Sequence, residues 1–407
     1  MPSRRSVPAG APYAPLHVVW ELTMRCDHAC AHCGSRAAKP RPDELDTPEL
    51  LDVAAALVKL GVREVALIGG EAYLHPGVFE LTRFFSERDV RVIMQTGGRG
   101  LTPALAKRLA ADGMASVGVS VDGPEAAHDE LRASHGSHKA AISALYAAKE
   151  AGMLTSSNTQ VNRLNAHLLW ETLAALRPTG IVAWRAQLTA PMGRAADRPE
   201  WILEPWRILE VIDTLGAMQL EIAEDAHARG IPPKRMLDIQ LGNNLGYYGP
   251  HEQILRSRPG TRVTWYQGCT AGRYVLSIES DGTIKACPSL PTAPYVGGNV
   301  RTTDLSRAWD ESPALTFARD RGVDELWGFC KGCMYAEICK GGCTFTAHTT
   351  LGKRGNNPFC YHRAATFKKQ GLRERLIQKE RAAGDPYDFG RFEIVEEPWG
   401  GAPGQDG

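Results

Sequence analysis

The spacing of the ten cysteines constrains this chain of 407 residues more than any other feature. Three lie at positions 26, 30 and 33, none follows for more than two hundred residues, and the other seven lie between positions 269 and 360. In a chain of this size without a secretory signal, cysteines grouped in this way are more often metal ligands than disulfide partners. The sequence therefore predicts two metal-binding regions, separated by a long segment that contains no cysteine.

Charge and hydropathy exclude several classes of partner. The chain has 47 basic and 46 acidic residues, and this balance provides no electrostatic basis for binding nucleic acid or an anionic membrane. Arg4 and Arg5 are not followed by the apolar stretch of a secretory signal, and no run of about 18 apolar residues suggests a membrane span. We expect a cytoplasmic protein with no nucleic-acid or membrane partner.

The first half of the chain alternates short apolar strands with amphipathic helices. Thr47, followed by Pro48, is the expected cap of the first helix, which Gly61 ends. The expected strands are residues 17–22, 65–68, 90–96, 116–121, 156–161 and 181–188. Such alternation implies a parallel sheet, either a partial barrel or an open doubly wound sheet. Both place ligands at the carboxyl ends of the strands.

Cys26, Cys30 and Cys33 follow the first expected strand in the pattern C-x3-C-x2-C. A loop can direct three thiolates at one point. Iron–sulfur clusters normally take four thiolates, so three would leave one iron of a [4Fe–4S] cluster open to an outside ligand. Two alternatives are a zinc site completed by His28 or His32, and free buried thiols.

The residues before this loop, Trp20-Glu21-Leu22-Thr23-Met24-Arg25, together with the three cysteines, resemble the opening of radical S-adenosylmethionine (SAM) enzymes. The resemblance extends over nearly the whole chain. It implies that Cys26, Cys30 and Cys33 hold a catalytic [4Fe–4S] cluster whose open iron binds SAM. The cluster would reduce SAM and release a 5′-deoxyadenosyl radical that abstracts hydrogen from the substrate.

The same resemblance implies a set of SAM-binding residues at successive strand ends. They are Gly69, Gly70 and Glu71 for the amino group, Ser120, Asp122 and Arg132 for the ribose and carboxylate, Leu188 in the segment that packs on adenine, and Thr96 and Gln160 as further candidates. Read without the resemblance, the two glycines could form only a tight turn, Ser120 and Asp122 could cap a turn, and Arg132 could belong to a surface ion pair.

The remaining seven cysteines resemble those of the SPASM domain, which carries auxiliary clusters in many radical SAM enzymes. The resemblance implies an outer cysteine group that holds one [4Fe–4S] cluster and an inner cysteine group that holds another; the outer group is Cys330, Cys333, Cys339 and Cys360, and the inner group is Cys269, Cys287 and Cys343. Relatives with a fully ligated inner cluster have a fourth cysteine between the first inner cysteine and the glycine at the position of Gly282, but residues 270–281 contain none. The inner cluster could therefore have an open iron, a non-cysteine ligand or only two irons. Zinc ribbons are an alternative, although seven ligands do not form two complete sites.

These patterns predict an α/β fold, a partial (β/α)6 TIM-like barrel with a C-terminal cysteine-rich SPASM domain. We expect an N-terminal tail at 1–15, the barrel at 16–235, a bridging segment at 236–260 and the SPASM domain at 261–372. We expect a basic helix over 363–382. The last segment, 373–407, would then contain the end of this helix and a disordered tail.

By resemblance, the expected function is maturation of a ribosomal peptide by crosslinking, epimerisation or oxidation. A low-potential donor such as flavodoxin or ferredoxin would supply electrons, and a separate protein or the SPASM face would recognise a leader. Cys287 is followed by Pro288 and not by the Asp of sulfatase maturases, which weakens that assignment. The alternatives are an enzyme acting on a small metabolite and a non-catalytic iron–sulfur electron carrier. A carrier would have no use for Gly69, Glu71, Ser120 and Arg132.

Overall fold

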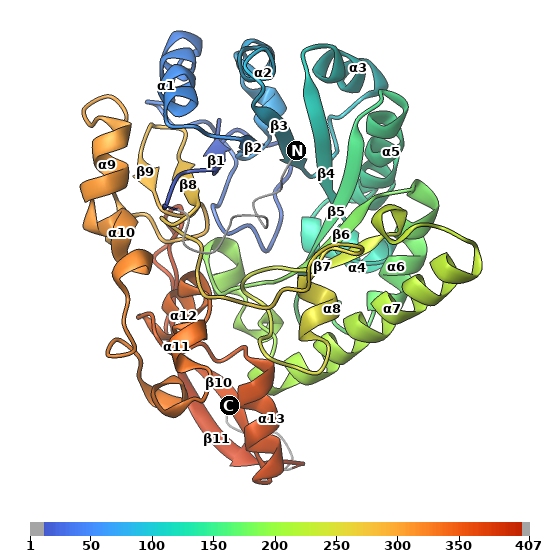
Figure 1. The fold of residues 1–407 in the computed structure, drawn as a ribbon, viewed down its shortest axis with the longest axis vertical. Coiled ribbons are helices and arrows are strands. Elements are labelled where there is room, and N and C mark those ends of the chain that lie inside the picture. Colours follow the sequence, from blue (N-terminus) through green and yellow to red (C-terminus); the bar gives the residue numbers. More distant parts are fainter. Residues whose placement is uncertain (1–11, 401–407) are drawn as a thin grey trace.

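The computed structural model describes residues 12–400, and most strands of this part of the chain form one curved sheet (Figure 1). Its order is β7-β6-β5-β4-β3-β2-β1-β8-β9. The first seven strands are β1 His17–Glu21, β2 Glu64–Ile68, β3 Arg91–Thr96, β4 Met114–Ser120, β5 Leu154–Val161, β6 Ala183–Leu188 and β7 Asp238–Leu241.

These seven strands are all parallel, and each pairs with its predecessor in the chain. A doubly wound sheet would reverse its strand order at a switch point, so this topology is that of a barrel that does not close. The predicted α/β partial barrel is confirmed. The strand β7 is additional, because it lies within 236–260, where only a bridging segment was expected.

Helices cover the outside of the sheet in Figure 1. They are α1 Thr47–Lys59, α2 Val78–Ser86, α3 Pro103–Ala111, α4 Glu125–Arg132, α5 Ser137–Glu150, α6 Leu169–Leu176 and α7 Ile208–Ala228. The cap of α1 is Asp46 and not Thr47, because the Asp46 carboxylate accepts the Glu49 N–H while Glu49 accepts the Asp46 N–H. In the described part of the chain, no helix has both the length and the apolar character needed to cross a membrane.

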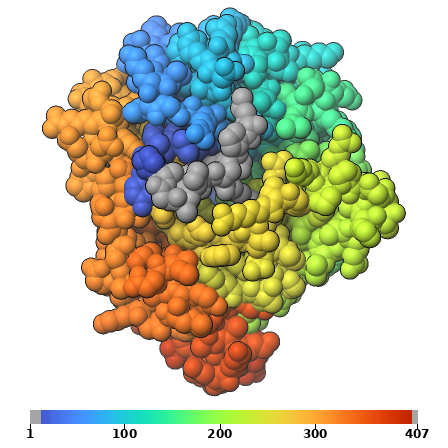
Figure 2. Space-filling view, in the orientation of Figure 1, coloured from blue at the N-terminus to red at the C-terminus, as the bar shows by residue number. Residues whose placement is uncertain are grey.

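The cysteine-rich region continues the barrel sheet on the far side of β1. The strand β8 Val275–Ile278 runs parallel to β1, and β9 Ile284–Lys285 pairs antiparallel with β8. The helices that follow are α9 Leu305–Glu311, α10 Pro313–Asp320, α11 Ala336–Cys339, α12 Thr344–Leu351 and α13 Tyr361–Lys369. Residues 240–265, which include the short helix α8 Glu252–Arg256, lie across one face between the barrel and the cysteine-rich region (yellow in Figure 2).

The predicted C-terminal helix and disordered tail are wrong over the described part of 373–407. The helix α13 ends at Lys369, and β10 Leu372–Glu380 and β11 Arg391–Pro398 form an antiparallel hairpin. Its charges pair across the strands, as in Arg373–Glu397 at 2.7 Å. The acidic residues of this segment therefore stabilise a folded hairpin, although the composition suggested a disordered tail. Residues 401–407 lie outside the described residues.

Candidate active site and cysteine groups

The first cysteine loop follows β1 and is fixed by backbone contacts from the other side of the barrel. The Arg194 guanidinium donates to the Cys30 carbonyl at 2.6 Å, and the Arg194 N–H donates to the Cys33 carbonyl at 2.9 Å. Burial raises the pKa of the Cys26 thiol to about 12, and charges on Cys30 and Cys33 act in the same direction. The three thiols therefore lie close enough to interact, and a metal cation would favour their ionised form.

Gly69 and Gly70 bring the end of β2 against this loop. The Gly70 N–H donates to the Thr23 carbonyl at 2.7 Å. A Cβ atom at Gly70 would lie 2.1 Å from the Arg25 carbonyl oxygen and 2.8 Å from the Cys26 Cβ. Only glycine fits here, because the backbone at the end of β2 touches the backbone of the cysteine loop.

Glu71 is buried beside Cys26 and accepts two hydrogen bonds, from the Thr96 hydroxyl at 2.5 Å and from the Gly97 N–H at 2.7 Å. Burial raises the pKa of Glu71 to about 8. Ligand atoms of Cys26, Asp27 and Glu71 lie within 4.8 Å of one another. This edge of the loop is polar and enclosed, and such a site can bind an ammonium group or a metal ion.

Asp122 and Arg132 form a buried ion pair next to Cys30. Arg132 donates from Nε and Nη2 to Asp122 Oδ2 at 2.8 and 2.6 Å, and its Nη1 lies 3.6 Å from Cys30 Sγ. Burial raises the pKa of Asp122, but the Arg132 charge reverses this, and the resulting pKa is well below its usual range. Arg132 is thus not part of a surface ion pair; it brings a fixed positive charge to a cysteine.

His32 is not available to complete a zinc site. Its Nδ1 hydrogen-bonds to the Leu131 carbonyl at 2.9 Å, and its Nε2 lies 3.4 Å from Asp122. Within the described residues, neither ring nitrogen of the buried His28 has a partner. His28 packs against Gly97, where an added Cβ would lie 2.8 Å from its ring.

The other expected SAM-binding residues lie at the same edge of the sheet. Thr96, Ser120 and Leu188 are the last residues of β3, β4 and β6. The Gln160 N–H on β5 donates to Asp122 at 2.8 Å. Because parallel strands end at one edge, residues far apart in sequence surround the first cysteine loop.

The four cysteines of the outer group line one small cavity, and Tyr247, Tyr248 and Tyr335 line it with them. The Tyr248 and Tyr335 rings stack with centroids 4.0 Å apart. Burial raises the pKa of Cys339 to about 12, and charges on Cys330 and Cys333 raise it further. Four thiols around one cavity suit a cluster with four thiolate ligands.

The inner cysteine group is also brought together. Burial raises the pKa of Cys343 to about 12, and charges on Cys269 and Cys287 act in the same direction. The Cys343 N–H donates to the Tyr247 hydroxyl at 3.1 Å. Cys269, Cys287 and Cys343 thus lie near one another, and the four cysteines of the outer group line a separate cavity.

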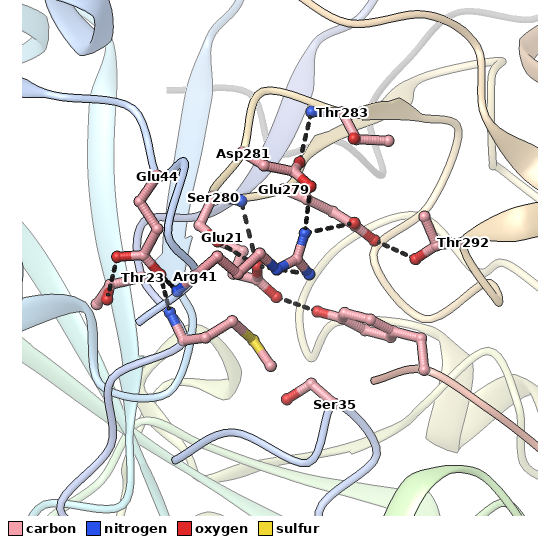
Figure 3. Close-up of polar contacts among 12 residues, drawn as sticks. Glu21, Thr23, Ser35, Arg41, Glu44, Glu279, Ser280, Asp281, Thr283 and Thr292 are labelled. Carbon is pink, nitrogen blue, oxygen red and sulfur yellow. Dashed lines mark hydrogen bonds and ion pairs between the residues drawn. The ribbon is translucent and has the colours of Figure 1, made fainter. Parts of the chain in front are cut away.

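A buried network of charges lies beside the end of β1, and the sequence did not reveal it (Figure 3). The Arg41 guanidinium lies 3.3 Å from Glu21, 3.0 Å from Glu279 and 2.7 Å from Asp281. The Tyr387 hydroxyl donates to Glu21 from the loop between β10 and β11. Sequence analysis did not single out Tyr387, and its segment was predicted to be disordered.

Two family comparisons agree with this arrangement. Residues 20–175 match the radical SAM superfamily, and residues 269–334 match the iron–sulfur cluster-binding domain called SPASM. The chain therefore contains a radical SAM domain and a SPASM domain. These two domains imply SAM and [4Fe–4S] clusters, with auxiliary clusters, as cofactors.

The similar proteins differ in what they act on. An AdoMet-dependent heme synthase of Nitratidesulfovibrio vulgaris is 27% identical, over 88% of this chain and 95% of that protein. The mycofactocin maturase MftC of Mycobacterium ulcerans is 29% identical, over 92% of this chain and 93% of its own. The structure of SuiB from Streptococcus suis bound to SAM has a TM-score of 0.63 at 16% identity, and it covers 86% of this chain and 76% of SuiB. At 16% identity, the likeness to SuiB shows only that the two chains share a fold.

Proposed function

We propose that this chain is a radical SAM maturase that abstracts hydrogen from a ribosomal peptide and installs a crosslink, an epimerised centre or an oxidation. The observation that carries the proposal is the arrangement of ten buried or half-buried cysteines in three groups, the first of which lies among polar residues at the strand ends. The similarity to MftC supports a peptide substrate. The reducing cytoplasm, where thiols stay reduced, is the compartment we propose.

The proposal assigns the first cysteine loop to the cluster that binds SAM, and the outer and inner cysteine groups to the auxiliary clusters. The thiols fit these clusters, because a bound metal cation offsets the cost of ionising a thiol whose pKa is raised by burial. When bound, the first cluster supplies the electron for reductive cleavage of SAM. We propose flavodoxin or ferredoxin as the donor of that electron.

The residues of the chain position SAM and balance its charges. Arg132 places a guanidinium beside Cys30, where it offsets negative charge on the thiolates, and Asp122 fixes its orientation. We assign Gly69, Gly70 and Glu71 to the amino group of SAM. Ser120 and Arg132 are assigned to the ribose and carboxylate, with Thr96, Gln160 and Leu188 completing the site.

A second candidate function is synthesis of a small molecule, and the similarity to heme synthases favours it. A pre-heme d1 synthase of Dinoroseobacter shibae is also similar, at 26% identity. In this reading the substrate would be a tetrapyrrole and not a peptide. The domain boundaries 16–235 and 261–372 are the same in both proposals.

Mass spectrometry after anaerobic incubation separates the two functions. The iron-loaded enzyme is incubated with SAM, a reductant and either candidate precursor peptides or tetrapyrroles. We expect a mass change in a peptide that requires both SAM and reductant. Conversion of a tetrapyrrole with no change in any peptide would support the second candidate and overturn the first.

A further inference from the structure

The loop between β10 and β11 contacts the first cysteine loop through one buried carboxylate. The Asp388 side chain is 7% exposed and accepts two hydrogen bonds from Arg36, one from Nε at 2.9 Å and one from Nη2 at 3.2 Å. Arg36 follows Cys33, the last thiol of the first loop, by three residues. A residue 352 positions away in the sequence therefore binds the end of the cysteine loop.

Asp388 also reaches the cysteine loop through its backbone. Its carbonyl accepts the Gly193 N–H at 2.8 Å. Gly193 lies directly against the loop, because a Cβ atom there would be 2.4 Å from the Cys33 carbonyl oxygen and 2.3 Å from that of Gly34. Two contacts from Asp388 therefore meet around Cys33, one through Arg36 and one through Gly193.

The backbone of Arg36 has a conformation that needs such support. Its φ of 55° lies in the left-handed region, where a residue other than glycine is strained and persists only when its surroundings impose the conformation. Asp197 also accepts from the Arg36 guanidinium, at 2.6 and 2.7 Å. The Asp197 side chain is 48% exposed, so water competes for that contact, whereas the Asp388 contact is shielded from water.

The segment that carries Asp388 is itself anchored on both sides. The Tyr387 hydroxyl donates to Glu21 at the end of β1, and Phe389 forms a β-bridge with Met192. The Asp388 carboxylate therefore has a fixed position independent of its contact with the cysteine loop. Groups fixed in this way around a metal site orient the ligands that they hold.

We propose that Asp388 is a positioning residue for the SAM-binding cluster, and that it acts by holding Arg36 and thereby the Cys33 thiolate. The inference rests on the proposed function, which assigns this cluster to the first cysteine loop. Its consequence is that the C-terminal hairpin determines how firmly the first loop holds iron.

Iron loss from the full, iron-loaded chain tests this under anaerobic conditions. An iron chelator is added, and electron paramagnetic resonance of reduced samples follows the cluster whose spectrum changes on addition of SAM. We expect Asp388→Asn to lose this cluster about 10-fold faster than the unmodified chain, with the auxiliary clusters lost at the unmodified rate. Asp385→Asn is the matched control, since Asp385 is exposed in the same loop and its replacement should have no effect.

A double variant separates positioning from general destabilisation. Asp388→Asn should add nothing to the effect of Arg36→Met, because Asp388 acts through the guanidinium that Arg36→Met removes. Unchanged iron loss in Asp388→Asn, equally fast loss of all clusters, or effects that multiply in the double variant would overturn the inference alone.

Arg36→Lys is a milder variant that keeps the charge but loses the planar fork, so it tests the inference even where the other variants fail to fold. It should also lose the SAM-responsive cluster faster, and an unchanged rate would overturn the inference. An unmodified, iron-loaded chain with no cluster that responds to SAM would overturn the proposed function as well.

Discussion

At the residue scale, the candidate active site depends on charges that are buried in pairs. Asp122 and Arg132 are both buried, and Arg132 also touches Cys30. In such a pair the loss of one partner leaves the other charge without compensation in a medium that solvates it poorly. The carboxylate of Asp122 thus does two things: it keeps the fold stable, and it fixes a guanidinium beside a cluster ligand.

Asp122→Asn should lower the free energy of unfolding by about 3–5 kcal/mol, because Arg132 remains buried without its carboxylate. Anaerobic urea unfolding measures this loss. The control Glu311→Gln removes one partner of the exposed pair Arg307–Glu311 and should leave the free energy of unfolding nearly unchanged. Equal losses in the two variants would contradict the role of burial.

Gly70→Ala should reduce iron at the first cysteine loop, because the new methyl group would lie 2.1 Å from the Arg25 carbonyl and displace the loop. Iron and sulfide analysis should show fewer irons per chain, with the auxiliary clusters intact. Gly332→Ala is the control, since a Cβ there has no atom within 4 Å. Full iron content in Gly70→Ala would show that the loop tolerates the displacement.

At the scale of elements, local patterns predicted most of the barrel. Apolar periodicity predicted six strands and most of the helices between them. The expected SAM-binding residues could be placed at strand ends because each motif directly follows a strand in the sequence. The hairpin β10–β11 could not be predicted in this way. Its strands are charged on most positions, and the pairs that stabilise them, such as Arg373–Glu397, join residues whose register the sequence does not specify.

Glu374→Gln tests how the hairpin is attached. Glu374 accepts two hydrogen bonds at 2.6 Å from Arg363, and both side chains are buried. We expect faster amide hydrogen exchange across 372–398, because the buried Arg363 loses its counter-charge. Glu380→Gln, which affects only the exposed pair with Arg391, should leave exchange nearly unchanged. Unchanged exchange in Glu374→Gln would mean that other contacts hold the hairpin.

At the scale of the whole molecule, one network joins three distant parts of the chain. Arg41 binds Glu21 at the end of β1 and Glu279 after β8 (Figure 3). The Tyr387 hydroxyl donates to Glu21 from the loop between β10 and β11. Sequence analysis missed this network, since it depends on contacts between segments far apart in the chain. The cysteine groups could be proposed because the sequence carries motifs that resemble those of radical SAM enzymes and of the SPASM domain.

Arg41→Met should destabilise the protein more at pH 8 than at pH 5. Burial raises the pKa of Glu21 in the folded protein, although Arg41 opposes the shift. Because the pKa of Glu21 is higher in the folded protein than in the unfolded one, where it is about 4.3, protonation of Glu21 stabilises the fold at low pH. This stabilisation is lost as the pH rises through the pKa of Glu21 in the folded protein. Without Arg41 the pKa rises further, so the stability deficit should grow with pH. A deficit that does not change with pH would contradict this assignment.

The central claim is that the first cysteine loop, and not the auxiliary groups, supports cleavage of SAM. The direct measurement is 5′-deoxyadenosine formed by anaerobically prepared, iron-loaded and reduced protein. We predict formation by the unmodified chain, background levels in Cys30→Ala, and retention of part of the cleavage in Cys333→Ala, which should nevertheless form no modified product. Equal loss of 5′-deoxyadenosine in both variants, or no cleavage by fully loaded protein, would contradict the account.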